Sequence, residues 1–110
     1  MIGIFRHAKA DAGEDEMMRP LAQEGIYQAK TMQKRVDVSW DILLCSEAVR
    51  TQQTGIILAD IVPEIIEELY ISFDPSEDYI QKLLLVIQPY WQGGDNVLIV
   101  THQPMICPLL

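Results

Sequence analysis

Four residues of this chain have types and positions that could do chemistry together. His7 and His102, the only two histidines, each come shortly after a short apolar run. Arg6 adjoins His7, and Arg50 comes a few residues after a third apolar run. Guanidinium groups match phosphate oxygens with paired hydrogen bonds, and each charge-assisted bond contributes roughly 1.5–3 kcal/mol. The four side chains therefore predict an anion site, provided that the fold brings them together.

A histidine in such a cluster could also act as a nucleophile. Neutral imidazole can attack phosphorus, whereas its protonated form cannot, and free histidine titrates near pH ~6.5. Because neighbouring cations lower that pKa, Arg6 and Arg50 would keep His7 neutral. Attack would give a phosphohistidine intermediate that water later hydrolyses, with His102 and the arginines stabilising the transferred group. Spacing alone leaves a structural or surface role open for each of these residues.

The elements that must position these residues are strands and helices in alternation. Continuous apolar runs at residues 1–5, 41–45 and 96–101 predict strands that are covered on both faces. Alternation with helical segments predicts an α/β fold, a three-layer α/β/α sandwich with a mainly parallel sheet. The carboxyl ends of parallel strands share one edge of the sheet, where ligands bind in this architecture. We therefore expect both histidines at that edge.

Helices are predicted at about residues 20–36, 48–62 and 75–91. The first and third present apolar or small residues at helical spacing, which predicts that these two faces pack in the core. The first face consists of Leu21, Gly25, Ala29, Met32 and Val36, and the third of Ile80, Leu83, Leu84, Ile87 and Trp91.

Prolines and an aspartate mark the expected ends of these helices. Pro63 should stop the second helix. Asp74 is the expected N-cap of the third helix, with Pro75 in its first turn. Pro89 should kink or end the third helix, because it lacks a backbone donor.

Composition and charge limit the partners. The chain has 110 residues, 49% of them hydrophobic and 22% charged, which predicts one domain with a packed core. A net charge of −8 argues against nucleic acid or an anionic membrane as a partner. No apolar run of about 18 residues and no signal-peptide pattern is present, so a cytoplasmic protein is expected. Cys45 ends an apolar run and is expected to be a buried, inert thiol. Cys45 and Cys107 lie far apart in the sequence, and neither a metal site nor a disulfide is expected from them.

Four segments resemble motifs of the histidine phosphatase superfamily, which has the phosphoglycerate mutase-like fold. Residues 5–10 (FRHAKA) resemble its RHG or RHA signature, and residues 19–25 (RPLAQEG) resemble the RPLTxxG element of its SixA-type phosphohistidine phosphatases. Residues 45–54 (CSEAVRTQQT) are similar to SSPxxRTxQT, and residues 97–104 (VLIVTHQP) to the strand that leads into GHxP or SHxP. One RH dipeptide would carry no weight, whereas four motifs in the family's order are specific.

The resemblance implies a phosphatase in which His7 accepts the phosphoryl group within a pocket of Arg6, Arg50 and His102. No cofactor and no metal is expected. A metal hydrolase that uses both histidines is the weaker alternative, because the sequence has no HExxH motif and no histidine-rich spacing.

Three further residues are expected to serve this site. The resemblance implies Arg19 near the rim and Ser46 as a support of the pocket, both as substrate-binding residues. Glu68, ahead of its neighbour Glu67, is the candidate general acid, because related enzymes often have an acidic residue in this region. An exposed carboxylate without a catalytic role is the alternative for Glu68.

The sequence departs from the family pattern at four positions and at its end. Ala8 and Met105 replace glycines, Glu47 replaces a proline, and Ala22 replaces a helix-capping threonine, which should cost about 1 kcal/mol. The family normally continues past the region where this chain ends at Leu110. We therefore expect residues 1–110 to form a single histidine phosphatase-like domain whose C-terminal part is missing. An uncovered strand edge would favour marginal stability or self-association.

The substrate has more than one interpretation. The short intervals between motifs leave no insertion long enough for a lid, and an open site suits a phosphate displayed on a protein surface. A phosphohistidine-bearing protein is the expected substrate, because its labile P–N bond needs less help from an acid. A small phosphate ester is one alternative, and a non-catalytic phosphate-binding or interaction module is the other.

Overall fold

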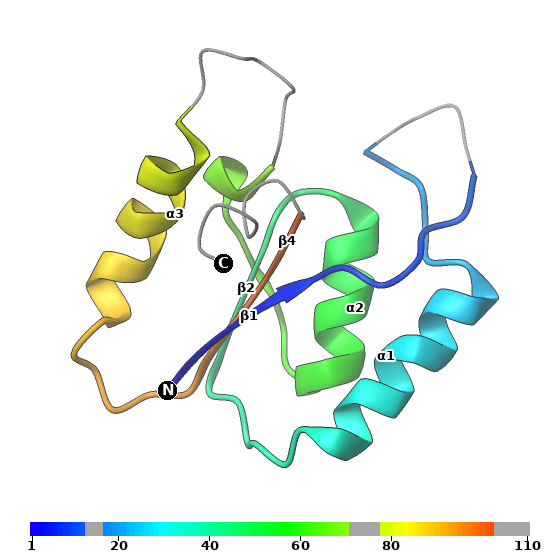
Figure 1. Ribbon diagram of the computed structural model, residues 1–110, viewed down its shortest axis with the longest axis horizontal. Helices are drawn as coiled ribbons and strands as arrows, with labels where there is room; N and C mark the ends of the chain where they lie inside the picture. Colours follow the sequence, from blue (N-terminus) through cyan, green and yellow to red (C-terminus); the bar gives the residue numbers. More distant parts are fainter. Residues whose placement is uncertain (13–16, 71–77, 103–110) are drawn as a thin grey trace.

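The computed structural model describes residues 1–12, 17–70 and 78–102. Strands and helices alternate along the chain, with two short 3₁₀ turns, η1 and η2, in its second half (Figure 1). In chain order the elements are β1 (Ile2–Arg6), α1 (Gln23–Arg35), β2 (Ile42–Cys45), α2 (Val49–Ala59), β3 (Glu64–Ile65), η1 (Glu67–Leu69), α3 (Tyr79–Ile87), η2 (Gln88–Tyr90) and β4 (Val97–Thr101).

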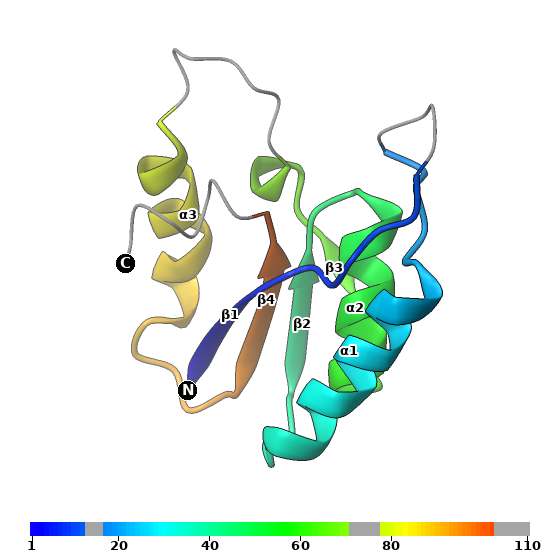
Figure 2. The ribbon, with the colours of Figure 1, turned by 45° about the vertical axis from the view of Figure 1, so that its right-hand side comes forward.

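A four-stranded parallel sheet forms the centre of the fold, in the order β1-β4-β2-β3 (Figure 2). The three strands predicted from apolar runs are present, each within one residue of its expected bounds. The fourth strand, β3, is only two residues long and was not predicted, because a pair of residues has no readable periodicity. Since all pairings are parallel, the carboxyl ends of the strands lie at one edge, as expected.

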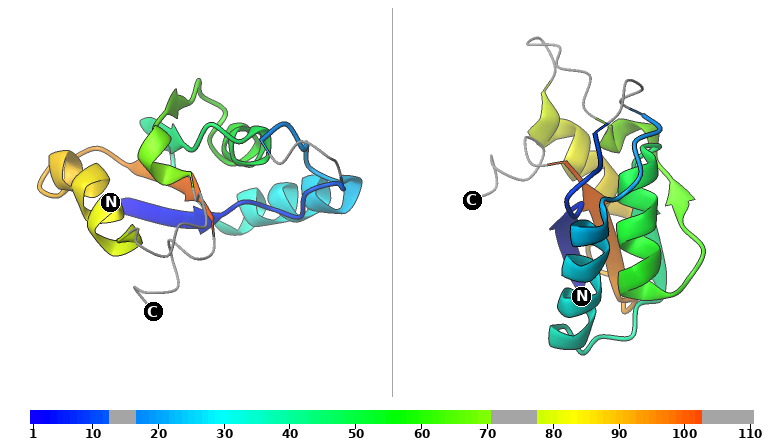
Figure 3. Two further views of the ribbon diagram at one scale, coloured as in Figure 1. Left: turned by 90° about the horizontal axis from the view of Figure 1, so that it is seen from above. Right: turned by 90° about the vertical axis from the view of Figure 1, so that its right-hand side faces the viewer.

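Helices cover both faces of this sheet, with α1 and α2 on one side and α3 on the other (Figures 2 and 3). Successive strand residues therefore point into two different cores. Leu43 packs in a cluster with Leu58 of α2, whereas its neighbour Leu44 packs with Leu83 of α3. Strands buried on both faces explain the continuous apolar runs, and the predicted three-layer α/β/α fold is confirmed.

All three helices are shorter than predicted, and α3 begins only at Tyr79, although it ends close to Pro89 as predicted. Asp60 adopts the left-handed conformation, with φ of 54°, and closes α2 three residues before Pro63. Helix α3 ends at Ile87 and passes into η2, which contains Pro89. At its start, Asp78 accepts a hydrogen bond of 3.0 Å from the backbone N–H of Gln81. The expected N-cap at Asp74, with Pro75, lies outside the described residues.

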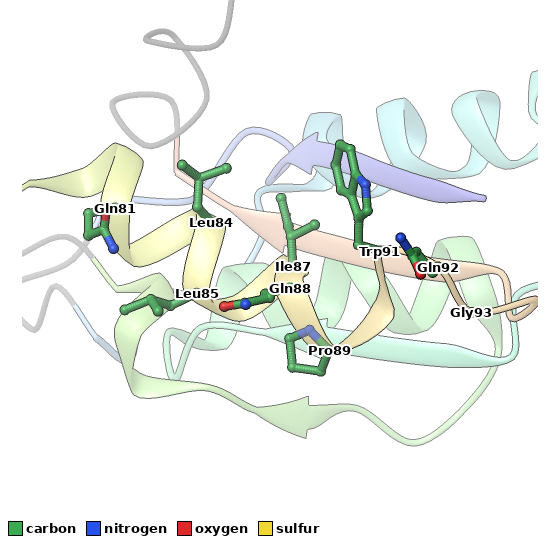
Figure 4. Close-up of a pocket in the computed structure, with 9 residues that line it drawn as sticks. All are labelled: Gln81, Leu84, Leu85, Ile87, Gln88, Pro89, Trp91, Gln92 and Gly93. Carbon is green, nitrogen blue, oxygen red and sulfur yellow. The ribbon is translucent and has the colours of Figure 1, made fainter.

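The prediction that a whole face of the third helix is buried is wrong in part. Leu83 and Ile87 are buried, whereas Ile80, Leu84 and Trp91 are 40%, 46% and 67% exposed. Leu84 and Trp91 line a shallow hollow of about 680 Å³ along α3 and η2 (Figure 4). Leu83 and Ile87, four residues apart, form the stripe of α3 that packs in the core, so Leu84, one position further along, turns toward solvent. Trp91 lies beyond the end of α3 at Ile87 and does not continue this stripe.

Cys45 matches its expectation of a buried, inert thiol. Its side chain is fully buried in β2, and burial raises the pKa of the thiol to about 12. Its thiolate is therefore not populated at neutral pH. Cys107 lies outside the described residues.

The sheet has two edges, and β1 forms one of them. Self-association through an open edge stays a prediction. In the described ranges, every helix is too short or too polar to cross a bilayer.

Gly25 allows α1 to approach the segment that follows the first strand. A Cβ added at Gly25 would overlap the backbone carbonyl oxygen of Lys9, which also accepts a hydrogen bond of 3.0 Å from the N–H of Ala22. Gly25 and Ala29 are buried as predicted, although Met32 of the same expected face is 38% exposed. Because the overlap involves the backbone, a side-chain rotation cannot relieve it.

We expect Gly25→Ala to lower the free energy of unfolding by roughly 1–3 kcal/mol, as an overpacked site does. Helix propensity alone would give the opposite sign, a gain of roughly 1 kcal/mol. Urea unfolding measures the difference. The matched control is Gly94→Ala, since an added Cβ there meets no atom within 4 Å, and its effect should stay within about 0.5 kcal/mol. A stabilised Gly25→Ala protein would contradict this reading of the α1 contact.

Candidate active site

The two histidines lie side by side at the carboxyl edge of the sheet. His7 follows β1 and His102 follows β4, its neighbour in the sheet, and the backbone N–H of His7 donates to the carbonyl of Thr101 at 3.1 Å. Their ring centroids are 5.3 Å apart and their planes cross at 67°. The fold therefore brings together the two imidazoles that the sequence places at strand ends.

The ring of His7 is held in one tautomer. Nδ1 lies 2.7 Å from the carbonyl oxygen of Ala8, and a carbonyl oxygen can only accept, so Nδ1 carries the hydrogen. Nε2 accepts from Nε of Arg50 at 3.4 Å. The lone pair of the neutral ring is therefore on Nε2, the nitrogen that faces Arg50.

The environment also keeps the ring of His7 neutral. Burial is the main cause that lowers its pKa, and the nearby cations Arg50, Arg6 and Arg19 lower it further, although the bond to the carbonyl of Ala8 raises it. The net shift is downward from 6.5. His7 thus combines a fixed orientation with an unprotonated Nε2 at neutral pH, as a nitrogen nucleophile requires.

Arg50 contributes a buried positive charge. It stands in the first turn of α2 and is only 4% exposed. The amino end of a helix adds a partial positive charge of its own, so this point of the fold favours an anion. Burial is the main cause that lowers the pKa of both His7 and His102, and the charge of Arg50 lowers both further.

His102 is buried and held from two sides. It is 6% exposed, its Nε2 lies 3.0 Å from Oγ of Ser46, and the ring of Tyr70 meets its ring edge to face at 5.4 Å. Burial lowers the pKa of His102 to about 3, with smaller contributions from the charges of Arg50, His7 and Arg6. His102 is therefore neutral in the unliganded protein.

The remaining predicted residues occupy different positions around this pair. Arg6 is exposed at the end of β1, and Arg19 is half-buried, with Nη1 3.5 Å from the carbonyl oxygen of Asp11. Ser46 is fully buried and meets His102. Glu68 is exposed in η1 and makes no hydrogen bond or ion pair within the described part of the chain.

Thr54 is a residue of this site to which the sequence analysis assigned no role. Its buried hydroxyl accepts from the N–H of Ala8 at 3.0 Å and donates to the carbonyl of Arg50 at 2.7 Å. Ala8 is thus held by Thr54 through its N–H while its carbonyl receives Nδ1–H of His7. The signal that could have found Thr54 is its spacing of four residues from Arg50, which places both on one helix face.

The arrangement can bind an oxyanion and present a nitrogen nucleophile to it. The guanidiniums of Arg6, Arg19 and Arg50 lie near enough to His7 to shift its pKa, so the local field is positive within an acidic protein. Among residues 1–12, 17–70 and 78–102, no three His, Cys, Asp or Glu side chains form a cluster that could hold a metal ion.

The lowered pKa values predict an acid-sensitive stability. Below about pH 6.5 the unfolded chain protonates its histidines while the folded chain does not, so protons favour unfolding. The free energy of unfolding should fall as the pH is lowered from about 6.5 to about 5, with a slope of up to about 1.4 kcal/mol per pH unit for each histidine. Urea unfolding at several pH values measures this slope.

The control for this slope is the double variant His7→Gln with His102→Gln. It retains every carboxylate, so the difference in slope between the two proteins belongs to the histidines. The variant should have a much flatter profile over this window. Equal slopes would show that the two rings are not shielded from protons in the folded state.

Solved structures resemble this chain, whereas no protein-family model and no curated protein matches it. A protein assigned as the phosphohistidine phosphatase SixA from Nakamurella multipartitia is 25% identical, with a TM-score of 0.79 over 96% of this chain. The chain spans 60% of the length of that protein.

Two further solved structures are similar to this chain over nearly its whole length. A protein histidine phosphatase SixA complexed with tungstate is 24% identical, with a TM-score of 0.79 over 98% of this chain and 72% of its own. A protein assigned as SixA from Agrobacterium tumefaciens is 25% identical, with a TM-score of 0.72 over 98% of this chain and 71% of its own.

Proposed function

From the premise that this chain has the fold of the histidine phosphatase superfamily, with SixA phosphohistidine phosphatases among its structural neighbours, we propose that it is a metal-independent phosphatase. The observation that carries the proposal is the environment of His7. Its Nδ1–H is bonded to the carbonyl of Ala8, so its lone pair is on Nε2, which meets the buried guanidinium of Arg50. A positive group that binds phosphate therefore adjoins a nitrogen that can attack it.

The reaction proceeds in two displacements at phosphorus. The N–H of Arg50 turns from Nε2 of His7 to an oxygen of the bound phosphoryl group, which frees the lone pair of Nε2. Nε2 then forms a bond to phosphorus while the bond between phosphorus and the leaving group breaks, and the leaving group takes up a proton. Arg6, Arg50 and His102 bind the equatorial oxygens, where negative charge is spread in the transition state. Water then attacks the phosphohistidine, releasing phosphate and returning His7 to its neutral form.

Two other residues act at the periphery of this reaction. Arg19 stands at the rim, close enough for its charge to lower the pKa of His7. Glu68 is the candidate acid for the leaving group, two residues before Tyr70, whose ring packs against His102. Its exposed position in η1 leaves its carboxylate able to meet a substrate that approaches from solvent.

We take phosphohistidine on a protein as the substrate class. Its P–N bond is labile, and the leaving imidazole can take the proton that it needs from water, so little help from an acidic side chain is needed. The SixA neighbours, one of them described as a protein histidine phosphatase, support this choice. A small phosphate ester with a poor leaving group should therefore react much more slowly.

Trapping of phosphate on the protein tests the proposal. The chain is mixed with a phosphohistidine-bearing protein in the presence of a metal chelator, quenched in alkali, and analysed by mass spectrometry. Phosphate should appear on His7, and His7→Ala should abolish both this adduct and turnover. Arg50→Ala should lower kcat/KM by roughly 100-fold or more, as the loss of a charge-stabilising donor does.

The matched control is Lys34→Ala, which removes one exposed cation from the last turn of α1. Its activity should stay within about two-fold of the unmodified protein, since exposed charges contribute little. Phosphate binding without any adduct on His7 would contradict the proposal and indicate a non-catalytic binding module. Loss of activity with the chelator would indicate a metal hydrolase instead.

A further inference from the structure

A pair of buried hydroxyls lies behind His102. Ser46 and Thr51 are both fully buried, and their side-chain oxygens are 2.9 Å apart. Oγ of Ser46 lies 3.0 Å from Nε2 of His102 and also accepts the N–H of Ala48 at 3.3 Å. A chain of hydrogen bonds therefore runs from the first turn of α2 to the imidazole that follows β4.

The direction of this chain follows from its far end. Oγ1 of Thr51 lies 2.8 Å from the carbonyl oxygen of Ala48 and 3.0 Å from that of Ser46. Both partners can only accept, so the hydroxyl proton of Thr51 is directed at them. The oxygen of Thr51 is then the acceptor for the hydroxyl proton of Ser46. With that proton committed, Ser46 can only accept from His102.

We propose that Ser46 and Thr51 are positioning residues that hold His102 in the tautomer protonated at Nε2. Nε2–H then donates to Ser46, and Nδ1 carries the lone pair and is the ring nitrogen left for a substrate. The two histidines hold opposite tautomers, because His7 donates from Nδ1 to the carbonyl of Ala8. The catalytic meaning of this arrangement rests on the proposed phosphatase function, whereas the tautomer itself does not.

The groups around His102 determine whether its ring is neutral or protonated. Arg50 from α2 and Arg6 from β1 act on its ring, together with His7, and the ring of Tyr70 packs against it. Burial, and to a smaller extent these charges, lower the pKa of His102 to about 3, so the ring is neutral at pH 7 before a substrate arrives. A neutral ring in this tautomer accepts a hydrogen bond at Nδ1 from the P–O–H of a phosphate monoanion, while it donates from Nε2 to Ser46.

The tautomer can be read directly from the nitrogen chemical shifts of the imidazole rings. The full chain, labelled with ¹⁵N, has only two histidines, so a long-range ¹H–¹⁵N correlation spectrum contains two ring patterns, and His7→Gln assigns them. Near pH 7 the pattern of His102 should be that of a neutral ring protonated at Nε2, and that of His7 should be protonated at Nδ1. A His102 pattern protonated at Nδ1 would overturn the inference before any further variant is made.

Thr51→Val tests the role of the hydroxyl pair. Without Thr51 as acceptor, Ser46 can turn its proton toward His102, so the pattern should shift toward protonation at Nδ1. Thr51→Ser keeps the hydroxyl and should restore the original pattern. The matched control is Thr31→Val, whose hydroxyl donates to the carbonyl of Tyr27 within α1 at 2.9 Å, and it should leave both ring patterns unchanged.

Kinetics separate this inference from the proposed function. Thr51→Val should lower kcat/KM roughly 10- to 100-fold, as the loss of a partner that orients a functional histidine does, and Thr51→Ser should recover most of it. An unchanged tautomer in both Thr51→Val and Ser46→Ala overturns the positioning role, even where phosphate still appears on His7. The predicted tautomers without any phosphate on His7 would instead overturn the proposed function and leave the positioning of His102 intact.

Discussion

The parallel pairing of β1 with β4 is the constraint on which the rest of the structure depends. Its register sets Arg6 opposite Thr101, so the next residues, His7 and His102, leave the sheet as neighbours. A slip of one residue would turn the alternating side chains of these strands to the opposite faces. The two cores, one beneath α1 and α2 and one beneath α3, thus fix the register that places the imidazoles together.

Helix α2 supplies the side chains that orient the two histidine rings at the edge of the sheet. Arg50 meets His7, Thr51 meets Ser46 behind His102, and Thr54 holds the N–H of Ala8. These three residues share the first two turns of one helix, so one rigid element orients both rings. Burying a guanidinium is costly, and an anion bound at the proposed site would offset part of that cost.

The sequence alone indicates much of this arrangement, because its strongest signals are also its strongest physical constraints. Continuous apolar runs predict the buried parallel strands, and residues that follow two such runs lie at the same edge of the sheet. Finer features of the structure escape such reasoning. The amphipathic pattern of α3 does not reveal how narrow its contact is, which left Leu84 and Trp91 wrongly assigned to the core. The proton directions at Thr51 depend on distances near 3 Å that no pattern of residue types encodes.

The central claim, that two imidazoles and a buried guanidinium surround one oxyanion, is tested most directly by a crystal structure of the chain with vanadate. The account predicts vanadium bonded to Nε2 of His7, with vanadate oxygens within about 2.7–3.2 Å of the guanidinium of Arg50 and of Nδ1 of His102. Vanadate bound elsewhere, or an Arg50 guanidinium turned away from an anion at His7, would contradict it.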